Sequence, residues 1–251
     1  MPTALITGAS GGIGLELARI FAREGYDLVL VARSRERMDE LARELKPASV
    51  QVIARDLTSP GAAEEIQRDV PKVDVLVNNA GYGVYGPFVK TQLAAEIGMI
   101  QLNVTVLVAL TKLYLPGMVA AKYGRIMNVA STAAFQPGPL MAIYYATKAF
   151  VLSFSEAIAN ELRGTGVTVT ALCPGPTATG FIAEAKLEKS RLFKLMKLMD
   201  ARTVAEAGYR ALMAGKPVVV TGLMNKVLAQ SVRFSPRGLV AKIARKMQEE
   251  A

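Results

Sequence analysis

The sequence contains no histidine and only one cysteine, Cys173, among its 251 residues. Without histidine the chain cannot form a Ser-His-Asp triad, a Cys-His pair, a histidine-containing zinc site or an imidazole general base. A single cysteine excludes an internal disulfide, which fits a reducing cytosol. Any catalysis by this chain must therefore use tyrosine, lysine, serine, a carboxylate or a bound cofactor. We expect no resident metal.

Long apolar runs are also missing, so we expect neither a signal peptide nor a membrane-spanning helix. Only Met1 and Pro2 precede the first apolar run, with no basic stretch before it. The most hydrophobic segment, 104–119, is interrupted by Lys112 and Pro116 and falls short of the roughly 18–20 residues that a span requires. We predict a cytoplasmic chain.

The composition favours a folded protein whose charge is unevenly distributed. Hydrophobic residues make up 51% of the sequence, enough for a large core. Residues 1–180 carry 16 basic and 15 acidic side chains, whereas residues 181–251 carry 14 basic and 6 acidic ones. Almost all of the net charge of +9 therefore belongs to the last part of the chain.

Short β-branched runs alternate with segments of helical period. We expect strands at 3–7, 27–32, 50–55, 73–77, 125–130, 167–172 and 217–221. We expect helices at 12–24, 35–46, 60–70, 91–115, 142–163, 181–199 and 203–214. Largely apolar strands separated by amphipathic helices indicate a parallel sheet covered on both faces. We predict an α/β protein with one doubly wound Rossmann-fold domain over 1–222 and a parallel sheet of about seven strands.

A glycine-rich turn, TGASGGIG at 7–14, joins the first strand to the first helix. Glycines let the backbone approach a pyrophosphate closely, and the helix N-terminus offers free N–H groups and the positive end of its dipole. The strand–loop–helix context favours a dinucleotide site over a simple tight connection. The residues predicted to bind the cofactor here are Gly8, Ser10, Gly12, Ile13 and Gly14.

The end of the second strand indicates which dinucleotide binds. An acid at this point would hold a ribose 2′-hydroxyl, but the sequence reads Ala32-Arg33-Ser34-Arg35 and has no acid before Glu36. A guanidinium suits a 2′-phosphate, because it can donate two parallel hydrogen bonds to phosphate oxygens. We therefore predict NADP(H) rather than NAD(H), with Arg33 as the discriminating residue. Solvated surface arginines are the alternative interpretation.

A Tyr144-x-x-x-Lys148 pair opens the long segment of helical period at 142–163. Residues four apart share a helix face, so the two side chains are neighbours while Tyr145 points elsewhere. A nearby ammonium favours the phenolate and lowers the tyrosine pKa from its usual value near ~10. The pair could then move a proton without histidine. A surface tyrosine packed on a lysine stem is the alternative.

Together these motifs resemble the classical short-chain dehydrogenase/reductase family over about residues 3 to 221. The resemblance also includes Asn78-Asn79-Ala80-Gly81 after the fourth strand and Ser131, thirteen positions before Tyr144. It implies that Tyr144 is the general acid/base, that Ser131 hydrogen-bonds the substrate oxygen, and that Lys148 holds the nicotinamide ribose. The catalytic set implied is Asn103, Ser131, Tyr144 and Lys148, with Asn103 anchoring a water for proton resupply. The further cofactor contacts implied are Asp56, Leu57, Asn79, Ala80, Gly81, Tyr144, Lys148, Pro174, Gly175, Thr177 and Thr179.

Several assignments keep alternatives. Asn103 could be a buried polar residue that satisfies backbone groups, and Thr132 could replace Ser131 as the hydroxyl donor. The pair Asn78-Asn79 could tie strands together rather than bind cofactor. Many NADP-dependent relatives carry a basic residue where this sequence has Gly11, so the NADP(H) prediction depends mainly on Arg33.

Two regions lie outside these motifs. Residues 181–199 occupy the place of the family's mobile substrate lid (about 181–200), and helical core is an alternative for their apolar side chains. The apolar residues there are Phe181, Leu187, Leu192, Phe193, Leu195, Met196, Leu198 and Met199. The loop 81–86 could add aromatic surface near the mouth. Residues 223–251 form a basic amphipathic extension that could be a solvated helix, a membrane contact or a partner contact.

The leading functional hypothesis is an NADP(H)-dependent oxidoreductase that interconverts a carbonyl and an alcohol, on a hydrophobic small-molecule substrate. A cofactor-sensing protein without catalysis is one alternative, and a membrane or interaction protein dominated by its tail is another. The resemblance implies a homodimer or homotetramer. Nucleic-acid binding is not expected, because no nucleic-acid motif accompanies the basic charge.

Overall fold

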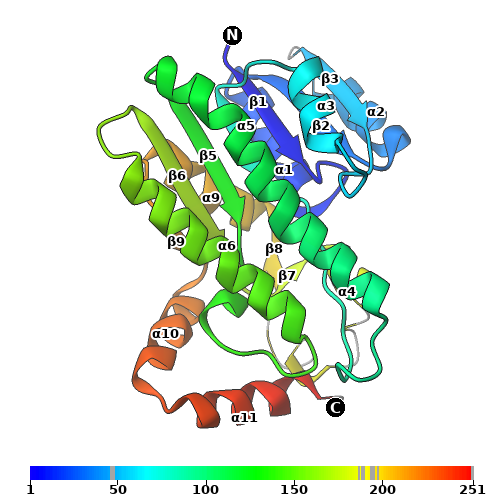
Figure 1. The fold of residues 1–251 in the computed structure, drawn as a ribbon, viewed down its shortest axis with the longest axis vertical. Coiled ribbons are helices and arrows are strands. Elements are labelled where there is room, and N and C mark those ends of the chain that lie inside the picture. Colours follow the sequence, from blue (N-terminus) through cyan, green and yellow to red (C-terminus); the bar gives the residue numbers. More distant parts are fainter. Residues whose placement is uncertain (46–48, 186, 188–189, 193–195, 197, 250–251) are drawn as a thin grey trace.

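The computed structural model describes residues 1–45, 49–185, 187, 190–192, 196 and 198–249. Its main sheet has seven parallel strands in the order β3-β2-β1-β4-β5-β6-β9 (Figure 1). These strands are β1 (Thr3–Thr7), β2 (Asp27–Ala32), β3 (Val50–Ala54), β4 (Val75–Asn78), β5 (Gly124–Val129), β6 (Val167–Cys173) and β9 (Val218–Val220). The predicted fold class, a doubly wound α/β sheet of about seven parallel strands, is confirmed.

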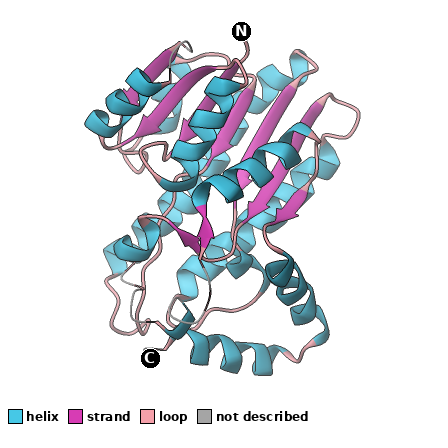
Figure 2. Ribbon diagram, turned by 180° about the vertical axis from the view of Figure 1, so that it is seen from behind, coloured by secondary structure: helices cyan, strands magenta, loops and turns pink. Residues whose placement is uncertain are grey.

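Helices cover both faces of this sheet, and the strands stand side by side between them in Figure 2. One face is covered by α1 (Gly12–Arg23), α2 (Arg35–Glu44) and α9 (Ala201–Met213). The other is covered by α3 (Ala62–Asp69), α5 (Leu107–Ala120) and α6 (Ala142–Glu161). Because both faces are buried, the strands are apolar almost throughout and do not alternate with polar residues.

The strand order places a crevice at one edge of the sheet. The chain runs outward from β1 through β2 to β3, then returns to β4 on the other side of β1. In a doubly wound sheet, ligands bind outside the carboxyl ends of the strands at such a switch point. Here those carboxyl ends are Thr7 and Asn78, which are followed directly by the two glycine-containing loops of the sequence.

The longest helical stretch differs from its expected bounds. It begins with α4 (Leu93–Ile100), continues through the π-helix η1 (Gln101–Val106) and ends with α5 at Ala120, so Pro116 lies inside it. By length and composition alone, the stretch Leu93–Ala120 could cross a membrane, contrary to our expectation from the sequence. Core helices pass the same test, and α5 buries Leu107, Leu110, Tyr114 and Met118 against the sheet, so this is weak evidence for a span.

The prediction of one helix over 181–199 is wrong in the part that the structure describes. The segment begins with the four-residue helix α7 (Phe181–Glu184) and ends in the strand β8 (Met199–Asp200), which pairs with β7 (Thr177–Ala178). Its apolar pattern has another cause: Ala185 and Leu187 are buried among aromatic side chains next to the crevice. The predicted lid residues Phe193 and Leu195 lie outside the described residues.

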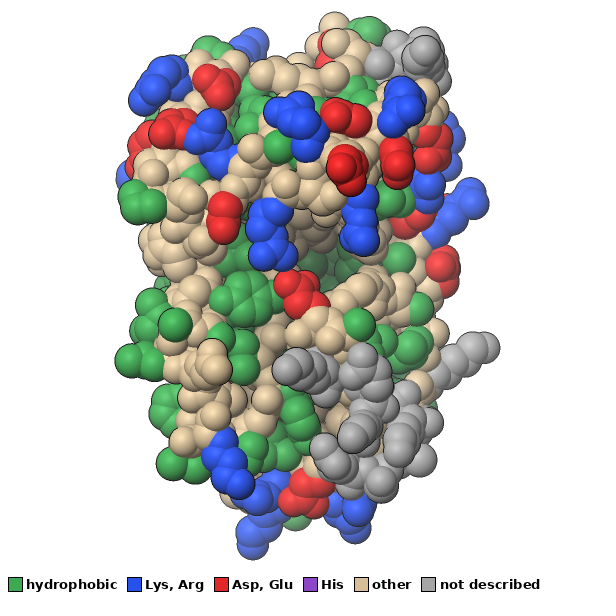
Figure 3. Space-filling view, turned by 90° about the vertical axis from the view of Figure 1, so that its right-hand side faces the viewer, with side chains coloured by type: hydrophobic (Ala, Val, Ile, Leu, Met, Phe, Trp, Pro, Cys, Tyr) green, Lys and Arg blue, Asp and Glu red, His purple; other side chains and the backbone are tan. Residues whose placement is uncertain are grey.

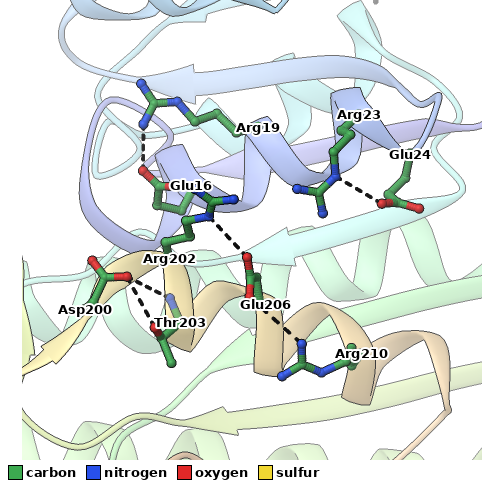
Figure 4. A network of polar contacts seen from close by, with 9 residues as sticks. All are labelled: Glu16, Arg19, Arg23, Glu24, Asp200, Arg202, Thr203, Glu206 and Arg210. Carbon is green, nitrogen blue, oxygen red and sulfur yellow. Dashed lines mark hydrogen bonds and ion pairs between the residues drawn. The ribbon is translucent and has the colours of Figure 1, made fainter.

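A polar network fixes the helix that follows this segment. Asp200 caps α9, because its carboxylate accepts hydrogen bonds from the backbone N–H (3.1 Å) and the hydroxyl (3.3 Å) of Thr203. Figure 4 shows this cap beside the ion pairs Arg202–Glu206 and Arg19–Glu16 on α9 and α1. Exposed pairs contribute little to stability, so the cap is the contact that defines where α9 begins.

The C-terminal extension folds into helices that lie beyond the carboxyl edge of the sheet. It contains α10 (Leu223–Ser231), the short 3₁₀ helix η3 (Val232–Phe234) and α11 (Arg237–Gln248). In Figure 1 these helices lie below the main sheet, with α11 in red along the base of the molecule. The extension therefore folds back beneath the crevice.

Candidate active site

The glycine-rich turn is shaped by contacts that leave no room for side chains. A Cβ on Gly14 would lie 2.5 Å from both the Gly8 carbonyl oxygen and the Asn79 Nδ2. Gly8 adopts φ +66°, and a Cβ there would lie 2.8 Å from the same Nδ2. Glycine is therefore required at both positions. The turn leads directly into α1, whose first residues Gly12 and Ile13 line the crevice, and the free N–H groups of a helix start suit a phosphate.

A small polar network ties this turn to the end of β4. The Thr7 hydroxyl accepts hydrogen bonds from the backbone N–H groups of Asn79 and Ala80, both at 3.0 Å. The Asn79 side chain donates to the carbonyls of Thr7 (2.9 Å) and Gly8 (3.2 Å). Asn78 instead donates to Asn128 on β5 (2.9 Å). Both asparagines thus hold strands and loops in place, and Thr7 is a site residue that the sequence interpretation missed.

Basic residues surround the crevice at the ends of β2 and β3. Arg33, Arg37 and Arg55 line it, and Figure 3 shows Lys and Arg side chains on the rim of the hollow. The Arg33 side chain is 74% exposed and makes one ion pair, to Glu184 on α7 (3.3 Å). Its guanidinium is therefore accessible to an anion. The sequence argument missed Arg37, which lies in the first turn of α2, because only the end of the second strand was considered.

Asp56 closes this end of the crevice. Its carboxylate accepts hydrogen bonds from the Thr58 hydroxyl (2.7 Å) and backbone N–H (2.9 Å). These two hydrogen bonds, and the charge of Arg33, lower the pKa of Asp56 below its usual value. A carboxylate held in this way can accept hydrogen bonds from a ligand.

The predicted catalytic side chains Ser131, Tyr144 and Lys148 meet where β5 ends and α6 begins. The Lys148 ammonium is 5.8 Å from the centroid of the Tyr144 ring and donates a hydrogen bond to the Val129 carbonyl (2.8 Å). Ser131 caps the short helix η2 (Thr132–Phe135) and hydrogen-bonds the Tyr144 phenol. The three groups therefore converge on one point of the crevice.

The pKa shifts in this group differ from the sequence prediction. Burial raises the pKa of Tyr144 above its ordinary value, and the Ser131 hydrogen bond acts against this rise. Burial also lowers the pKa of Lys148 to about 8. The expected depression of the Tyr144 pKa by Lys148 is not found, because both groups have left water and the ammonium is bonded to the Val129 carbonyl.

Asn103 lies in the π-helix η1, a helix form that is frequent at functional sites. Its side-chain oxygen accepts a hydrogen bond from the Tyr82 N–H (3.1 Å), and its nitrogen donates to the Tyr82 carbonyl (3.0 Å) and the Thr147 hydroxyl (3.1 Å). The amide thus fastens the loop after β4 to α6. This is the structural interpretation that the sequence left open, and the water-anchoring role stays a prediction.

One cavity of about 1480 Å³ joins these features. It is lined by every predicted site residue except two, Gly14 and Asn103. Gly14 packs against Gly8 and Asn79, and Asn103 is hydrogen-bonded to the backbone of Tyr82. The loop 81–86 and four of the predicted lid residues line it as well, so these lid side chains are cavity wall rather than plain core. The four are Phe181, Leu187, Leu192 and Met196. No group of three or more Cys, Asp or Glu side chains in the described part of the chain could hold a metal ion.

The cofactor segment after β6 is in contact with the C-terminal extension. A Cβ on Gly175 would lie 2.2 Å from the Nδ2 of Asn225, a buried residue of α10. Asn225 also donates a hydrogen bond to the Thr221 carbonyl (2.8 Å). Gly175 is therefore required by the extension, and Asn225 is another lining residue that the sequence did not indicate.

A dinucleotide cradle that opens onto a Ser-Tyr-Lys group, on a doubly wound sheet, defines the class of nicotinamide-dependent oxidoreductases. Comparison with known proteins gives the family. Residues 2–190 match the model of the short chain dehydrogenases. The chain belongs to the short-chain dehydrogenase family, whose members act on CH–OH and C=O groups.

Individual relatives support this placement. The chain is 33% identical over 217 residues to the ketoacyl reductase HetN of Nostoc sp., covering 84% of this chain and 75% of that protein. Among solved structures, it resembles a short-chain dehydrogenase from Sphingobium yanoikuyae in complex with NADPH (TM-score 0.86, 33% identity, 95% of each chain). It also resembles a bulky-bulky ketone specific alcohol dehydrogenase from Comamonas testosteroni (TM-score 0.79, 32% identity, 95% of this chain and 93% of that chain).

Proposed function

We propose that this short-chain dehydrogenase uses NADP(H) to interconvert a carbonyl and an alcohol on a hydrophobic small molecule, with Tyr144 as general acid/base. The observation that carries the proposal is the convergence of Ser131, Tyr144 and Lys148 on one point of a cavity that the glycine-rich turn also lines. The start of α1, where Gly11, Gly12 and Ile13 line the cavity, suits a pyrophosphate.

The exposed Arg33 guanidinium, with Arg37 beside it, supports NADP(H) over NAD(H). Two arginines that line the cavity, Arg33 directly after β2 and Arg37 in the first turn of α2, suit the doubly charged 2′-phosphate. The solved Sphingobium relative in complex with NADPH adds support. Binding the 2′-phosphate would replace the ion pair between Arg33 and Glu184, which is exposed and weak.

When bound, the cofactor supplies or accepts the hydride. During reduction, the Tyr144 phenol donates its proton to the substrate oxygen, and Ser131 donates a hydrogen bond to that oxygen and stabilises its developing charge. The Lys148 cation stabilises the phenolate that this transfer leaves behind. Burial raises the pKa of Tyr144, so the phenol carries the proton that reduction requires at neutral pH.

A panel of ketones, aldehydes and acyl thioesters with NADPH tests this function. We expect substrate-dependent oxidation of NADPH, at least tenfold faster than with NADH at equal concentration. The alternative of a cofactor sensor predicts tight NADPH binding by calorimetry without turnover of any substrate, so turnover separates the two.

We also propose that the chain assembles as a homodimer or homotetramer. Apolar side chains at the start of the Leu93–Ala120 stretch support this, because Leu93 and Ile97 are mostly exposed. Light scattering after gel filtration tests the proposal. A purely monomeric protein at micromolar concentration would contradict it.

Peripheral contact of a cytoplasmic protein with an anionic membrane is a second candidate, favoured by the outer surface of the extension. Leu223 and Phe234 are 79% and 89% exposed, and Lys242, Arg245 and Lys246 are exposed along α11. Apolar side chains flanked by cations are typical of helices that lie on anionic lipid.

Co-sedimentation with phosphatidylserine vesicles checks this contact. The triple variant K242E/R245E/K246E should lose pelleting, whereas the control K112E/K122E/R163E, exposed and outside the extension, should keep it. Equal pelleting of both variants, or none with wild type, would remove the membrane candidate.

A further inference from the structure

The far end of the cavity is built by residues that the family model does not cover. The model match ends at residue 190, but α10 and α11 supply cavity lining as far as Gln248. The lining residues with aliphatic side chains from these two helices are Leu228, Ala229, Val240, Ile243, Ala244 and Met247. We call the space that they line the distal chamber.

The charged side chains in the described part of the extension all lie outside the cavity. Lys and Arg are frequent in residues 223–249, yet none of the residues of this segment that line the cavity is charged. Val240, Ala244 and Gln248, spaced by four along α11, are buried toward the cavity, whereas Lys242 and Lys246 point out. The wall of the chamber is therefore uncharged and mainly apolar, and its polar members are Asn225, Ser231, Ser235 and Gln248.

Hydrogen bonds fix the last turn of α11 to the active site. Gln248 is 2% exposed, and its Nε2 donates to the hydroxyl of Tyr145 (2.6 Å), the immediate neighbour of Tyr144. The Gln248 carbonyl accepts from the Tyr85 hydroxyl (2.6 Å), and the Glu249 carbonyl accepts from the Arg191 N–H (3.0 Å). Among the described residues the amide Nε2 is paired with Tyr145 while the buried Oε1 has no hydrogen-bond partner, so it is the three hydrogen bonds above that hold the last turn of α11 in this position.

We propose that α10 and α11 form the distal chamber as a specificity element, which binds a long or bulky apolar part of the carbonyl substrate. Gln248 is the positioning residue that holds the wall closed. This inference rests on the proposed carbonyl chemistry and names the substrate class: ketones that carry an extended apolar group, without a charge at the end that reaches the chamber.

The expected effect follows from the burial of methylene groups. Each buried methylene contributes roughly 0.8 kcal/mol, or about fourfold in kcat/KM. In a series of 2-alkanones from 2-butanone to 2-dodecanone, kcat/KM should rise by about this factor per methylene until the chamber is filled. A flat series in the wild type would contradict the proposal.

Two substitutions fill the chamber from different helices. The substitutions are Ala229→Phe on α10 and Ala244→Phe on α11. In each variant, kcat/KM should stop rising at a ketone that is several methylenes shorter than in the wild type. For 2-butanone, kcat/KM should stay within about threefold of wild type. Leu239→Phe is the matched control, because Leu239 is 52% exposed on α11 and does not line the cavity. An unchanged length dependence in both filled variants would overturn the chamber.

The role of Gln248 has its own measurement. Gln248→Ala should raise KM for 2-decanone about tenfold while leaving kcat and KM for 2-butanone within about twofold, and Tyr145→Phe should give the same split. Combined, the two changes should not add, because they remove one hydrogen bond. An equal fall of kcat for both ketones would indicate a general structural defect instead.

Calorimetry of 2-decanone binding separates this inference from the proposed function. Binding that Ala244→Phe abolishes and Leu239→Phe retains supports the chamber even if no ketone is turned over. Turnover of short ketones with no binding of 2-decanone would keep the function and refute the chamber.

Discussion

Lys148 allows the most quantitative test of the structure, because a buried ammonium links folding stability to pH. Its side chain is 6% exposed, and its Nζ has one hydrogen-bond acceptor, the Val129 carbonyl. Burial lowers the pKa of Lys148 from 10.5 to about 8. A shift of this size corresponds to about 3 kcal/mol of unfavourable free energy at neutral pH.

The sign follows from proton binding. Between about pH 8 and 10.5 the unfolded chain keeps a proton on Lys148 that the folded protein has lost, so stability rises with pH in this window. Below pH 8 both states bind the proton and the full penalty is present. Lys148→Met removes the penalty at all pH values.

The assay is urea unfolding of wild type and Lys148→Met at pH 7 and pH 10.5. Relative to Lys148→Met, the free energy of unfolding of wild type should be about 3 kcal/mol higher at pH 10.5 than at pH 7. Lys112→Met, at an exposed position of α5, should show no such shift. A constant difference between wild type and Lys148→Met would refute the burial of a lysine charge at the active site.

Three further outcomes are expected. Arg33→Ala should weaken NADPH binding roughly 10- to 100-fold, because it removes charged hydrogen bonds to the 2′-phosphate, and should leave NADH binding unchanged. Calorimetry measures both affinities, and equal losses for both cofactors would contradict the prediction. Gly14→Ala should lower the free energy of unfolding by about 1–3 kcal/mol in urea titrations, because its Cβ would lie 2.5 Å from the Gly8 carbonyl oxygen. Gly11→Ala is the control and should change stability little, because nothing lies within 4 Å of a Cβ at that position. Because burial raises the pKa of Tyr144, the rate of alcohol oxidation should rise from pH 7 to about pH 8, where Lys148 begins to lose its charge; a flat pH–rate profile in this range would argue against Tyr144 as the base.

The sequence predicts the parts of the molecule that depend on local pattern. Buried parallel strands are apolar throughout, so the runs at 3–7 and 27–32 can be recognised as strands from the sequence alone. The turn after β1 can also be recognised from the sequence, because Gly8 and Gly14 lie so close to Asn79 that only glycine fits there. The spacing of four between Tyr144 and Lys148 places both on one face of α6.

The sequence does not predict contacts between distant segments. Nothing local indicates that Gln248 meets Tyr145, which lies 103 positions earlier in the chain, or that Asn225 packs on Gly175. The segment 181–199 was predicted wrongly because its described apolar residues, such as Phe181 and Leu187, pack in an aromatic cluster beside the cavity rather than along one helix face. The pKa direction of Tyr144 also depends on burial, which a spacing argument does not contain.

The central claim is that Tyr144 transfers the proton to the substrate oxygen. It is tested most directly by carbonyl-dependent NADPH oxidation in Tyr144→Phe, with NADPH binding measured on the same preparation. The account predicts a loss of at least 100-fold in kcat, with the Kd for NADPH within about threefold of wild type. Turnover at the wild-type rate by a variant that binds NADPH normally would contradict it.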